Sequence, residues 1–217
     1  MNSAIILASG HSKRFKNKTP KQFHKINGRI ILDYSVSAFS SCEKIHNITI
    51  VVPKDYHLEI KKQYPQHSVI IGGDNRRISS YKGLLNCHVD TKNVLIHDGA
   101  RALIDKKTIM RCLEGLNEAE AISLILPAQD TIVETKQNLI VKMPNRNSIF
   151  LEQTPQGFHY KTILEAHKKN QNDTTDDIRL VYEMGIKCKT ILGSEKNFKI
   201  TTLQDYKLAK LILEETK

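Results

Sequence analysis

The chain has no tryptophan, aromatic residues make up only 6% of it, and its four cysteines are scattered. So few aromatic side chains argue against the stacking platforms on which single-stranded nucleic acids bind. Cys42, Cys87, Cys112 and Cys188 form no CxxC pair and have no clustered histidine partners, so we expect reduced thiols and no zinc site. The nine histidines form no HExxH pattern either.

Long apolar runs are also missing. There is no stretch of about eighteen apolar residues and no apolar signal segment at the amino end, so we expect a soluble cytoplasmic protein without a membrane partner. The chain has 217 residues, of which 40% are hydrophobic and 26% charged. That is enough to bury the core of one α/β domain, and no linker or repeat divides the sequence. We therefore expect a single domain, residues 1–217.

Positive charge is in excess, with 33 lysines and arginines against 23 acidic residues and a net charge of +10. A charge of this sign predicts anionic partners. The basic residues are spread along the chain instead of forming a stripe on one helix, so a nucleic-acid-binding module is the weaker alternative. A phosphorylated small molecule together with a nucleotide fits the same charge. A dinucleotide oxidoreductase is disfavoured, because no G-x-G-x-x-G follows the first apolar run.

Apolar runs and amphipathic segments alternate along the chain. Such alternation predicts an α/β protein with a three-layer, Rossmann-like and largely parallel sheet. We expect strands at residues 4–8, 48–53, 69–71, 93–97, 123–126 and 187–192, and helices at residues 30–40, 56–63, 77–85, 106–120, 160–169, 176–184 and 203–215.

Residues 131–153 interrupt this rhythm. Two short apolar runs, at residues 132–134 and 139–141, flank a polar turn at residues 135–138, which predicts a β-hairpin. An isolated hairpin buries too little surface to be stable alone. We therefore expect it to protrude from the main sheet and to pack on a second subunit.

Polar clusters follow four of the expected strands: residues 9–21, 72–74, 98–101 and 127–131. In open α/β sheets, ligands bind outside the carboxyl ends of the strands. The first cluster also carries Arg14 and Lys21, two cations that could hold a phosphate chain from both sides. Each cluster alone is typical of a turn, a helix cap or a solvated loop, but together they predict a nucleotide-triphosphate site.

Several motifs in chain order resemble one enzyme family, the CTP-dependent cytidylyltransferases that act on 2-C-methyl-D-erythritol 4-phosphate and their close relatives that act on ribitol 5-phosphate. The motifs are LASGHSKR at residues 7–14, PKQF at 20–23, GGDNRRIS at 72–79, HDGAR at 97–101, DT at 130–131, QTPQ at 153–156, TDD at 175–177 and NFKITT at 197–202. The resemblance covers essentially the whole chain and implies a GT-A-like nucleotidyltransferase fold.

The resemblance also implies a reaction, in which a sugar-alcohol phosphate attacks the α-phosphorus of CTP and pyrophosphate leaves. The implied catalytic residues are Arg14, Lys21 and Lys199. The implied CTP contacts are Ala8, Ser9, Gly10, Gly73, Asp74, Ser79 and Gly99. The implied acceptor contacts are Asp98, Arg101, Thr131, Arg146, Thr154 and Thr175. Mg²⁺ would be held mainly by the CTP phosphates, with Asp98 as its candidate protein ligand. Residues 131–152 would form a dimerisation arm that crosses to the partner of a homodimer.

Three departures from the family pattern bear on rate and nucleotide selectivity. Ser12 stands where a glycine is usual, Ala102 where a proline is usual, and Ser9 where an alanine is common. Two acceptors stay open. The TDD motif and the compact length favour 2-C-methyl-D-erythritol 4-phosphate, whereas residues 130–134 and 144–146 look more like the enzymes for ribitol 5-phosphate. We take the first as the primary expectation, and ribitol 5-phosphate or another alditol phosphate as the alternative.

Overall fold

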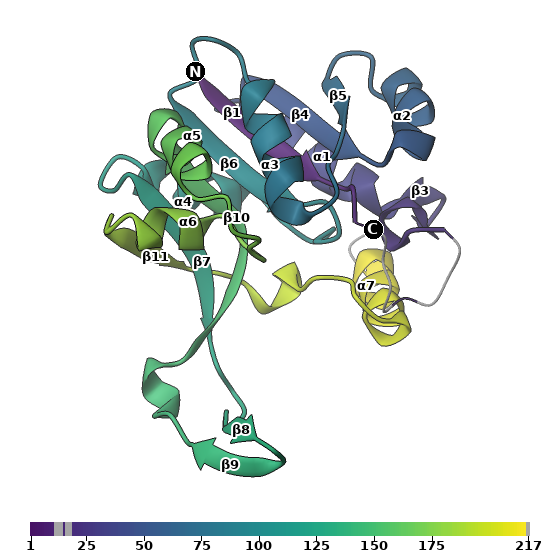
Figure 1. The fold of residues 1–217 in the computed structure, drawn as a ribbon. Helices are drawn as coiled ribbons and strands as arrows, with labels where there is room; N and C mark the ends of the chain where they lie inside the picture. Colours follow the sequence, from purple (N-terminus) through teal and green to yellow (C-terminus); the bar gives the residue numbers. More distant parts are fainter. Residues whose placement is uncertain (11–14, 16–18, 216–217) are drawn as a thin grey trace.

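The computed structural model describes residues 1–10, 15 and 19–215. Within these residues the main sheet has seven strands in the order β11-β7-β10-β6-β1-β4-β5 (Figure 1). Its strands are β1 (Asn2–Leu7), β4 (Asn47–Val52), β5 (Ser68–Ile71), β6 (Asn93–Asp98), β7 (Ala121–Pro127), β10 (Phe150–His159) and β11 (Cys188–Leu192). The pairings are parallel except at β10, which runs antiparallel to β6 and β7. The expected α/β class and largely parallel sheet are confirmed.

Helices cover both faces of the sheet and form the outer two of three layers (Figure 1). One buried cluster joins the sheet to α1 (Ile31–Ser40), α2 (His57–Gln63) and α4 (Lys106–Gly115). A second cluster joins its other face to α3 (Arg76–Leu85), α5 (Tyr160–Lys169) and α6 (Ile178–Glu183). A third cluster packs α7 (Leu203–Glu215) against the small hairpin of β2 (Lys25–Ile26) and β3 (Arg29–Ile30). Short 3-10 helices are η2 (Lys21–Phe23), η3 (Lys54–Tyr56), η4 (Arg146–Ser148) and η5 (Glu195–Asn197).

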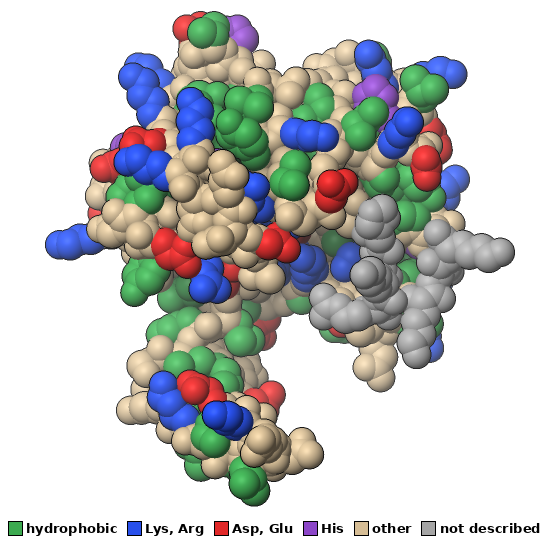
Figure 2. Space-filling view, viewed as in Figure 1, with side chains coloured by type: hydrophobic (Ala, Val, Ile, Leu, Met, Phe, Trp, Pro, Cys, Tyr) green, Lys and Arg blue, Asp and Glu red, His purple; other side chains and the backbone are tan. Residues whose placement is uncertain are grey.

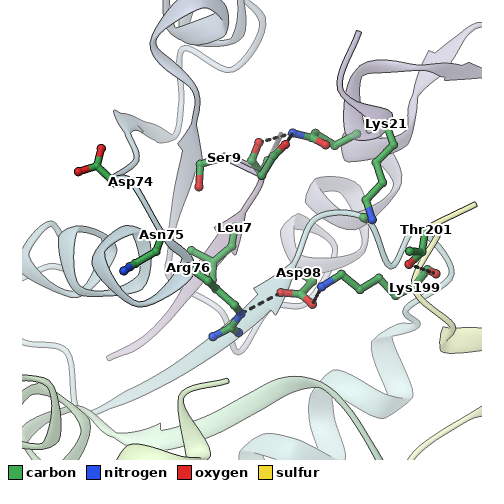
Figure 3. Close-up of a pocket in the computed structure, with 14 residues that line it drawn as sticks. Leu7, Ser9, Lys21, Asp74, Asn75, Arg76, Asp98, Lys199 and Thr201 are labelled. Carbon is green, nitrogen blue, oxygen red and sulfur yellow. Dashed lines mark hydrogen bonds and ion pairs between the residues drawn. The ribbon is translucent and has the colours of Figure 1, made fainter. Parts of the chain in front are cut away.

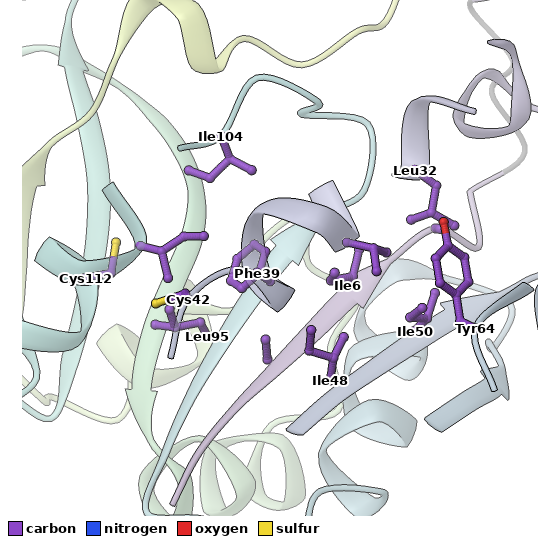
Figure 4. Packing of buried hydrophobic residues seen from close by; sticks show 14 of the residues in the cluster. Ile6, Leu32, Phe39, Cys42, Ile48, Ile50, Tyr64, Leu95, Ile104 and Cys112 are labelled. Atoms are coloured by element: carbon purple, nitrogen blue, oxygen red, sulfur yellow. The ribbon is translucent and has the colours of Figure 1, made fainter. Parts of the chain in front are cut away.

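Strand β1 shows why the apolar runs predicted strands correctly. Its side chains alternate between the two faces, so Ile6 joins one core cluster and Ile5 and Leu7 join the other. A strand buried on both faces is a nearly continuous apolar run, as residues 4–7 are here. Figure 4 shows Ile6 in its cluster, together with Phe39 from α1 and neighbouring strand residues.

Three parallel strands end level with one another near the middle of the sheet. Leu7 at the end of β1 is paired in register with Asp98 at the end of β6 and with Val51 on β4. The loops that follow these strands therefore emerge side by side at one edge, where the sequence predicted a ligand site.

The long strand β10 is absent from the strands predicted above. It contains Pro155, Gly157 and two polar residues, Gln153 and Gln156, that are buried instead of solvated. A bulge between Gln153 and Gln156 includes the cis Thr154–Pro155 peptide. Pattern rules expect Pro and buried polar residues away from central strands, and here hydrogen bonds and the bulge accommodate them.

The predicted hairpin is present as β8 (Glu134–Lys136) and β9 (Leu139–Lys142), and it projects away from the sheet (Figure 1). Its turn is shorter than expected, because only Gln137 and Asn138 connect the strands, with φ values of 52° and 64°. Positive φ at both central residues is the geometry that fits the twist of a two-residue hairpin.

Helix α4 is shorter than predicted and ends at Gly115 instead of continuing to Glu120. A Cβ at Gly115 would lie 2.5 Å from Ile191 Cδ1, so the helix approaches β11 closely there. The carbonyl of Glu120 instead accepts a hydrogen bond from the His159 amide, which ties this segment to β10.

Candidate active site

A pocket of about 440 Å³ lies at the edge of the sheet where the carboxyl ends of β1, β4 and β6 meet (Figure 3). Three of the four predicted polar clusters contribute to it, from the loops after β1, β5 and β6, and the segment after η5 closes one side. Its lining residues are Leu7, Ala8, Ser9, Gly10, Lys21, Gln22, Gly73, Asp74, Asn75, Arg76, Asp98, Ala100, Lys199 and Thr201.

The loop after β1 is held in shape by Gln22. Its side-chain amide donates hydrogen bonds to the carbonyls of Ala8 (2.6 Å) and Gly10 (3.0 Å). Gln22 and Lys21 belong to η2, so the same short helix fixes the loop and places Lys21 in the pocket. Arg14, the other predicted cation of this loop, lies outside the described residues.

The glycine-rich loop after β5 is tied to the first loop by two serines. The Ser9 hydroxyl donates to Ser79 Oγ at 2.8 Å, and Ser79 Oγ also accepts the amide hydrogen of Gly73 at 3.0 Å. A Cβ at Gly72 would lie 2.5 Å from Ser9 Cβ, and one at Gly73 would overlap the Ile78 side chain. Glycine at position 72 therefore lets the two loops approach each other, and glycine at position 73 lets the second loop pack against the start of α3.

Asp98 lies at the centre of the pocket's charges. Its carboxylate is 2.8 Å from Lys199 Nζ, 3.4 Å from Arg76 Nε and 4.0 Å from Arg101 Nε. Burial alone would raise the pKa of Asp98, but the three cations outweigh burial and hold the pKa far below its usual range. Asp98 is therefore an anion throughout the physiological pH range.

Thr154 supports Asp98 from beneath and does not line the pocket. Its hydroxyl accepts the Asp98 amide hydrogen at 3.0 Å and donates to His97 Nδ1 at 3.1 Å. The other ring nitrogen of His97 donates to the Arg101 carbonyl at 3.3 Å. Burial lowers the pKa of His97 to about 4, so the ring is neutral and both nitrogens are used.

Arg101 also acts from behind the pocket wall. Its Nη1 donates to the Asn197 carbonyl at 2.9 Å, and the Ile200 amide donates to the Ala100 carbonyl at 2.9 Å. These bonds fix the segment that carries Lys199, which Figure 3 shows pointing into the same part of the pocket as Lys21.

Gly99 lies behind the pocket as well, and Ala100 lines it instead. The Gly99 amide donates to the Leu7 carbonyl at 2.9 Å, and a Cβ there would lie 3.0 Å from Leu32 Cδ1. The predicted ribose neighbour is thus a point of close packing between β6, β1 and α1.

The remaining predicted acceptor residues do not line this chain's pocket. Arg146 is exposed on the arm, where its Nη1 donates to the Gln129 carbonyl at 3.0 Å, and Thr131 is exposed nearby. Thr175 is exposed and donates to Asp176 Oδ2 at 3.0 Å. The fourth polar cluster, residues 127–131, follows β7 and leads into the arm. Because β10 lies between β7 and β6 in the sheet, this cluster is set apart from the other three.

Arg76 is a pocket residue to which the sequence interpretation gave no role. It is the first residue of α3, and its guanidinium contacts Asp98 and, at 2.6 Å, Asp177. Its Nη2 is buried without a hydrogen-bond partner among the described residues, which leaves a donor for a ligand. The available signal was its place two residues after the GGD turn, which follows a predicted strand.

A metal ion would find few protein ligands here. Within residues 1–10, 15 and 19–215, no group of three or more His, Cys, Asp or Glu side chains is arranged to hold one. The ionised Asp98 carboxylate in the pocket suits Mg²⁺, which commonly takes one or two carboxylates and fills its other positions with phosphate oxygens and water.

A glycine-lined pocket with clustered cations at the carboxyl ends of parallel strands is typical of nucleotide-binding α/β enzymes, among them the nucleotidyltransferases. The family model of 2-C-methyl-D-erythritol 4-phosphate cytidylyltransferase (IspD) matches residues 2–215, and the chain belongs to this family of CTP-dependent enzymes. It is 36% identical over 224 residues to the 2-C-methyl-D-erythritol 4-phosphate cytidylyltransferase of Caldanaerobacter subterraneus, covering 98% of this chain and 99% of that one. It is 38% identical over 215 residues to the enzyme of the same name from Clostridium perfringens, covering 95% and 96%.

Solved structures agree with this membership. The 4-diphosphocytidyl-2C-methyl-D-erythritol synthase of Anaerococcus prevotii superposes with a TM-score of 0.87 at 26% identity, covering 98% of this chain and 96% of that one. The bifunctional IspDF of Campylobacter jejuni gives 0.83 at 31% identity, covering 95% of this chain and 53% of that one. Among the helices in the described ranges, none is long and apolar enough to cross a membrane.

Proposed function

We propose that the protein transfers the cytidylyl group of CTP to 2-C-methyl-D-erythritol 4-phosphate and releases pyrophosphate. The observation that carries this proposal is the pairing of Asp98 with Lys199 beside Lys21, in a pocket whose other side is the glycine-rich loop. Transfer between phosphates needs positioning and charge neutralisation more than covalent chemistry, and this cluster supplies both.

CTP would lie between the two loops that Ser9 and Ser79 connect. Ala8, Gly10, Gly73 and Asp74 line that part of the pocket and would contact the base, and the close approach of the loops would exclude a purine. Gly99 would act by allowing β1 and β6 to pack closely behind the ribose. Lys21 and Lys199, with Arg14, would spread the charge that develops on the triphosphate.

We infer that Mg²⁺ is held mainly by the triphosphate, with Asp98 as its protein ligand. A bound Mg²⁺ would neutralise charge on the phosphates. Asp98 is suited to the role because its low pKa keeps it ionised whether or not the metal is present.

The protein would act as a homodimer whose arms, residues 131–152 of a single 1–217 domain, cross to the other subunit. Hydrophobic side chains are exposed along the arm, among them Leu139 (69%), Ile140 (60%) and Met143 (63%), and Figure 2 shows such side chains on its surface. Apolar groups gathered on a projecting hairpin favour burial against a partner. Thr131 and Arg146 of the partner subunit would then reach the acceptor phosphate, opposite Asp98 and Thr175.

The acceptor follows from the family. Residues 130–134 and 144–146 had left ribitol 5-phosphate open, but the match over residues 2–215 to a family named for 2-C-methyl-D-erythritol 4-phosphate supports that acceptor. Location in the cytoplasm, where CTP is available, stays a prediction.

Steady-state pyrophosphate release by the purified full chain tests the proposal. We expect turnover with CTP, Mg²⁺ and 2-C-methyl-D-erythritol 4-phosphate, and a kcat/KM at least about tenfold lower with ribitol 5-phosphate. Replacement of CTP by UTP, or omission of the metal, serves as the matched control. Faster turnover with ribitol 5-phosphate would contradict the acceptor assignment, and no turnover with either would contradict the proposed function.

A further inference from the structure

A buried chain of charged side chains connects the pocket to the helices beneath it. His167 on α5 lies with Nε2 3.0 Å from Asp177 Oδ1, and Asp177 Oδ2 lies 2.6 Å from Arg76 Nη1. Arg76 Nε in turn lies 3.4 Å from Asp98 Oδ1. The side chains of His167 and Asp177 are fully buried, so neither can contact a substrate directly.

Arg76 is therefore shared between two carboxylates, and it is held more tightly by the one outside the pocket. Its contact with Asp177 is 2.6 Å, slightly shorter than a typical charge-assisted hydrogen bond, whereas its 3.4 Å contact with Asp98 is long. Asp98 Oδ2 meanwhile contacts Lys199 at 2.8 Å. The arrangement keeps Arg76 from forming a two-pronged pair with Asp98.

Asp177 is itself fixed from two sides. Its amide donates to Gln156 Oε1 at 2.9 Å, which ties the start of α6 to β10. Since an ionised carboxylate only accepts hydrogen bonds, His167 Nε2 must be the donor to it. Burial alone would raise the pKa of Asp177, but Arg76 and His167 outweigh it and lower the pKa.

We propose that Asp177 and His167 are positioning residues for cytidylyl transfer, which hold Arg76 back from Asp98 so that Asp98 stays available to Lys199 and the reacting groups. This inference rests on the proposed function for its kinetic consequences. Without the Asp177 charge, Asp98 would be the remaining ion-pair partner of Arg76 among the described residues. Arg76 would then close on it bidentately, since the guanidinium fork matches a carboxylate.

The competing explanation is that Asp177 and His167 only stabilise the packing of α5 and α6. Two variants of His167 separate the explanations. His167→Gln retains an N–H donor near the position of Nε2 and loses the ring, whereas His167→Phe retains the ring that stacks on Tyr81, with centroids 5.6 Å apart, and loses the donor. Leu180→Ala, at a buried apolar position on α6, weakens the packing without touching the chain of charges.

Steady-state kinetics of these variants, compared at similar loss of Tm, form the test. We expect Asp177→Asn and His167→Phe to lower kcat about 10²-fold, because a small misplacement near the reacting groups is enough to do so. The KM for CTP should change less than about threefold, because the base loops lie outside the chain of charges. His167→Gln and Leu180→Ala should retain kcat within about threefold of the wild type. Equal losses in Leu180→Ala and Asp177→Asn, or a better kcat in His167→Phe than in His167→Gln, would overturn the inference.

A crystal structure of Asp177→Asn provides a readout that does not depend on turnover. We expect two guanidinium nitrogens of Arg76 to bind the Asp98 carboxylate. The distance from Asp98 Oδ2 to Lys199 Nζ should be longer than the present 2.8 Å. An Arg76 that stays in place would contradict the inference. A wild-type protein without cytidylyltransferase activity would contradict the proposed function instead. The position of Arg76 in the Asp177→Asn structure would then still decide whether Asp177 holds Arg76 away from Asp98.

Discussion

The Lys199 ammonium lies 2.8 Å from Asp98 Oδ2, although the two residues come from distant parts of the sequence. The contact depends on backbone pairing as well as on charge, because the Ile200 amide donates to the Ala100 carbonyl directly beside it. Arg101 reinforces the arrangement by binding the Asn197 carbonyl. The Lys199 cation and the Asp98 anion are thus brought together by backbone pairing between the segment after β6 and the loop after η5.

Removal of one of the three proposed catalytic cations should impair the transition state more than the fold. We expect Lys199→Met, Lys21→Met and Arg14→Ala each to lower kcat/KM roughly 10²–10³-fold, by analogy with removal of a donor to a developing anion. The matched control is Lys196→Met, an exposed lysine three residues before Lys199, which should leave kcat/KM and Tm unchanged. Near-normal turnover of any of the three at low CTP would contradict the placement of the phosphates.

Base selection should depend on the close contact between the loops. Gly73→Ala places a Cβ against Ile78, so the loop must shift and the KM for CTP should rise by about tenfold or more. The matched control is Gly115→Ala, where a Cβ would lie 2.5 Å from Ile191 Cδ1 and outside the pocket, so the Tm should fall while the KM for CTP stays unchanged. Initial rates over a range of CTP, UTP and ATP concentrations test this. Equal use of UTP or ATP by the wild type would contradict the assignment of the base pocket.

The buried neutral His97 should make stability fall in mild acid. Its pKa is about 4 in the folded chain, against about 6.5 unfolded, so the unfolded chain takes up a proton first as the pH falls. This should remove about 2 kcal/mol of the free energy of unfolding between about pH 7.5 and about pH 5. Asp98 and Asp177 have lowered pKa values, so they stabilise the fold above the unfolded aspartate pKa of about 4. Their contribution to the free energy of unfolding therefore stays nearly constant between about pH 5 and about pH 7.5.

Urea unfolding of the wild type and His97→Gln at both pH values measures that effect. The variant should be less stable at the higher pH, since Thr154 loses its acceptor, but its stability should fall by about 2 kcal/mol less on acidification. The same pH dependence in both proteins would show that His97 is not the source.

Exchange of subunits should reveal whether the active site is shared. If the arm crosses to a partner, Arg14 of one chain acts together with Arg146 of the partner subunit. Homodimers of Arg14→Ala and of Arg146→Ala should both be nearly inactive. Mixing them should give heterodimers in which one site carries both changes and the other carries neither, so activity per heterodimer should approach about half that of the wild type.

A site contained within one chain would give no recovery, because each site in the mixture would carry one change. Light scattering provides the accompanying control, since a monomeric protein would contradict the crossed arm directly. Tagged subunits that exchange and yet stay inactive would contradict it as well.

The sequence predicted most of the sheet because β1, β4 and β6 are buried on both faces and each carries a run of apolar residues. It did not predict β10, whose buried Gln153 and Gln156 look like loop residues until their hydrogen-bond partners are known. Gln153 Nε2 donates to the Ser194 carbonyl at 2.9 Å, and Gln156 accepts the Asp177 amide hydrogen. Partners so far apart in sequence leave no local pattern.

The same limit applies to the site. Lys21, Asp98 and Lys199 could be predicted, since each stands in a motif beside a predicted strand end or in the NFKITT segment, and the structure brings them into one pocket. The role of Arg76 could not be predicted, because it depends on a contact with Asp177 that forms only when α3 and α6 both pack against α5.

Phosphorus NMR of the complete reaction is the most direct test of the proposed cytidylyl transfer from CTP to 2-C-methyl-D-erythritol 4-phosphate. The purified protein is incubated with CTP, Mg²⁺ and 2-C-methyl-D-erythritol 4-phosphate, and the spectrum is followed as substrates are consumed. We expect equal amounts of inorganic pyrophosphate and of a new diphosphodiester, as the triphosphate and phosphomonoester signals disappear together. Persistence of the phosphomonoester while CTP is consumed, or no reaction with this acceptor while ribitol 5-phosphate is converted, would contradict it.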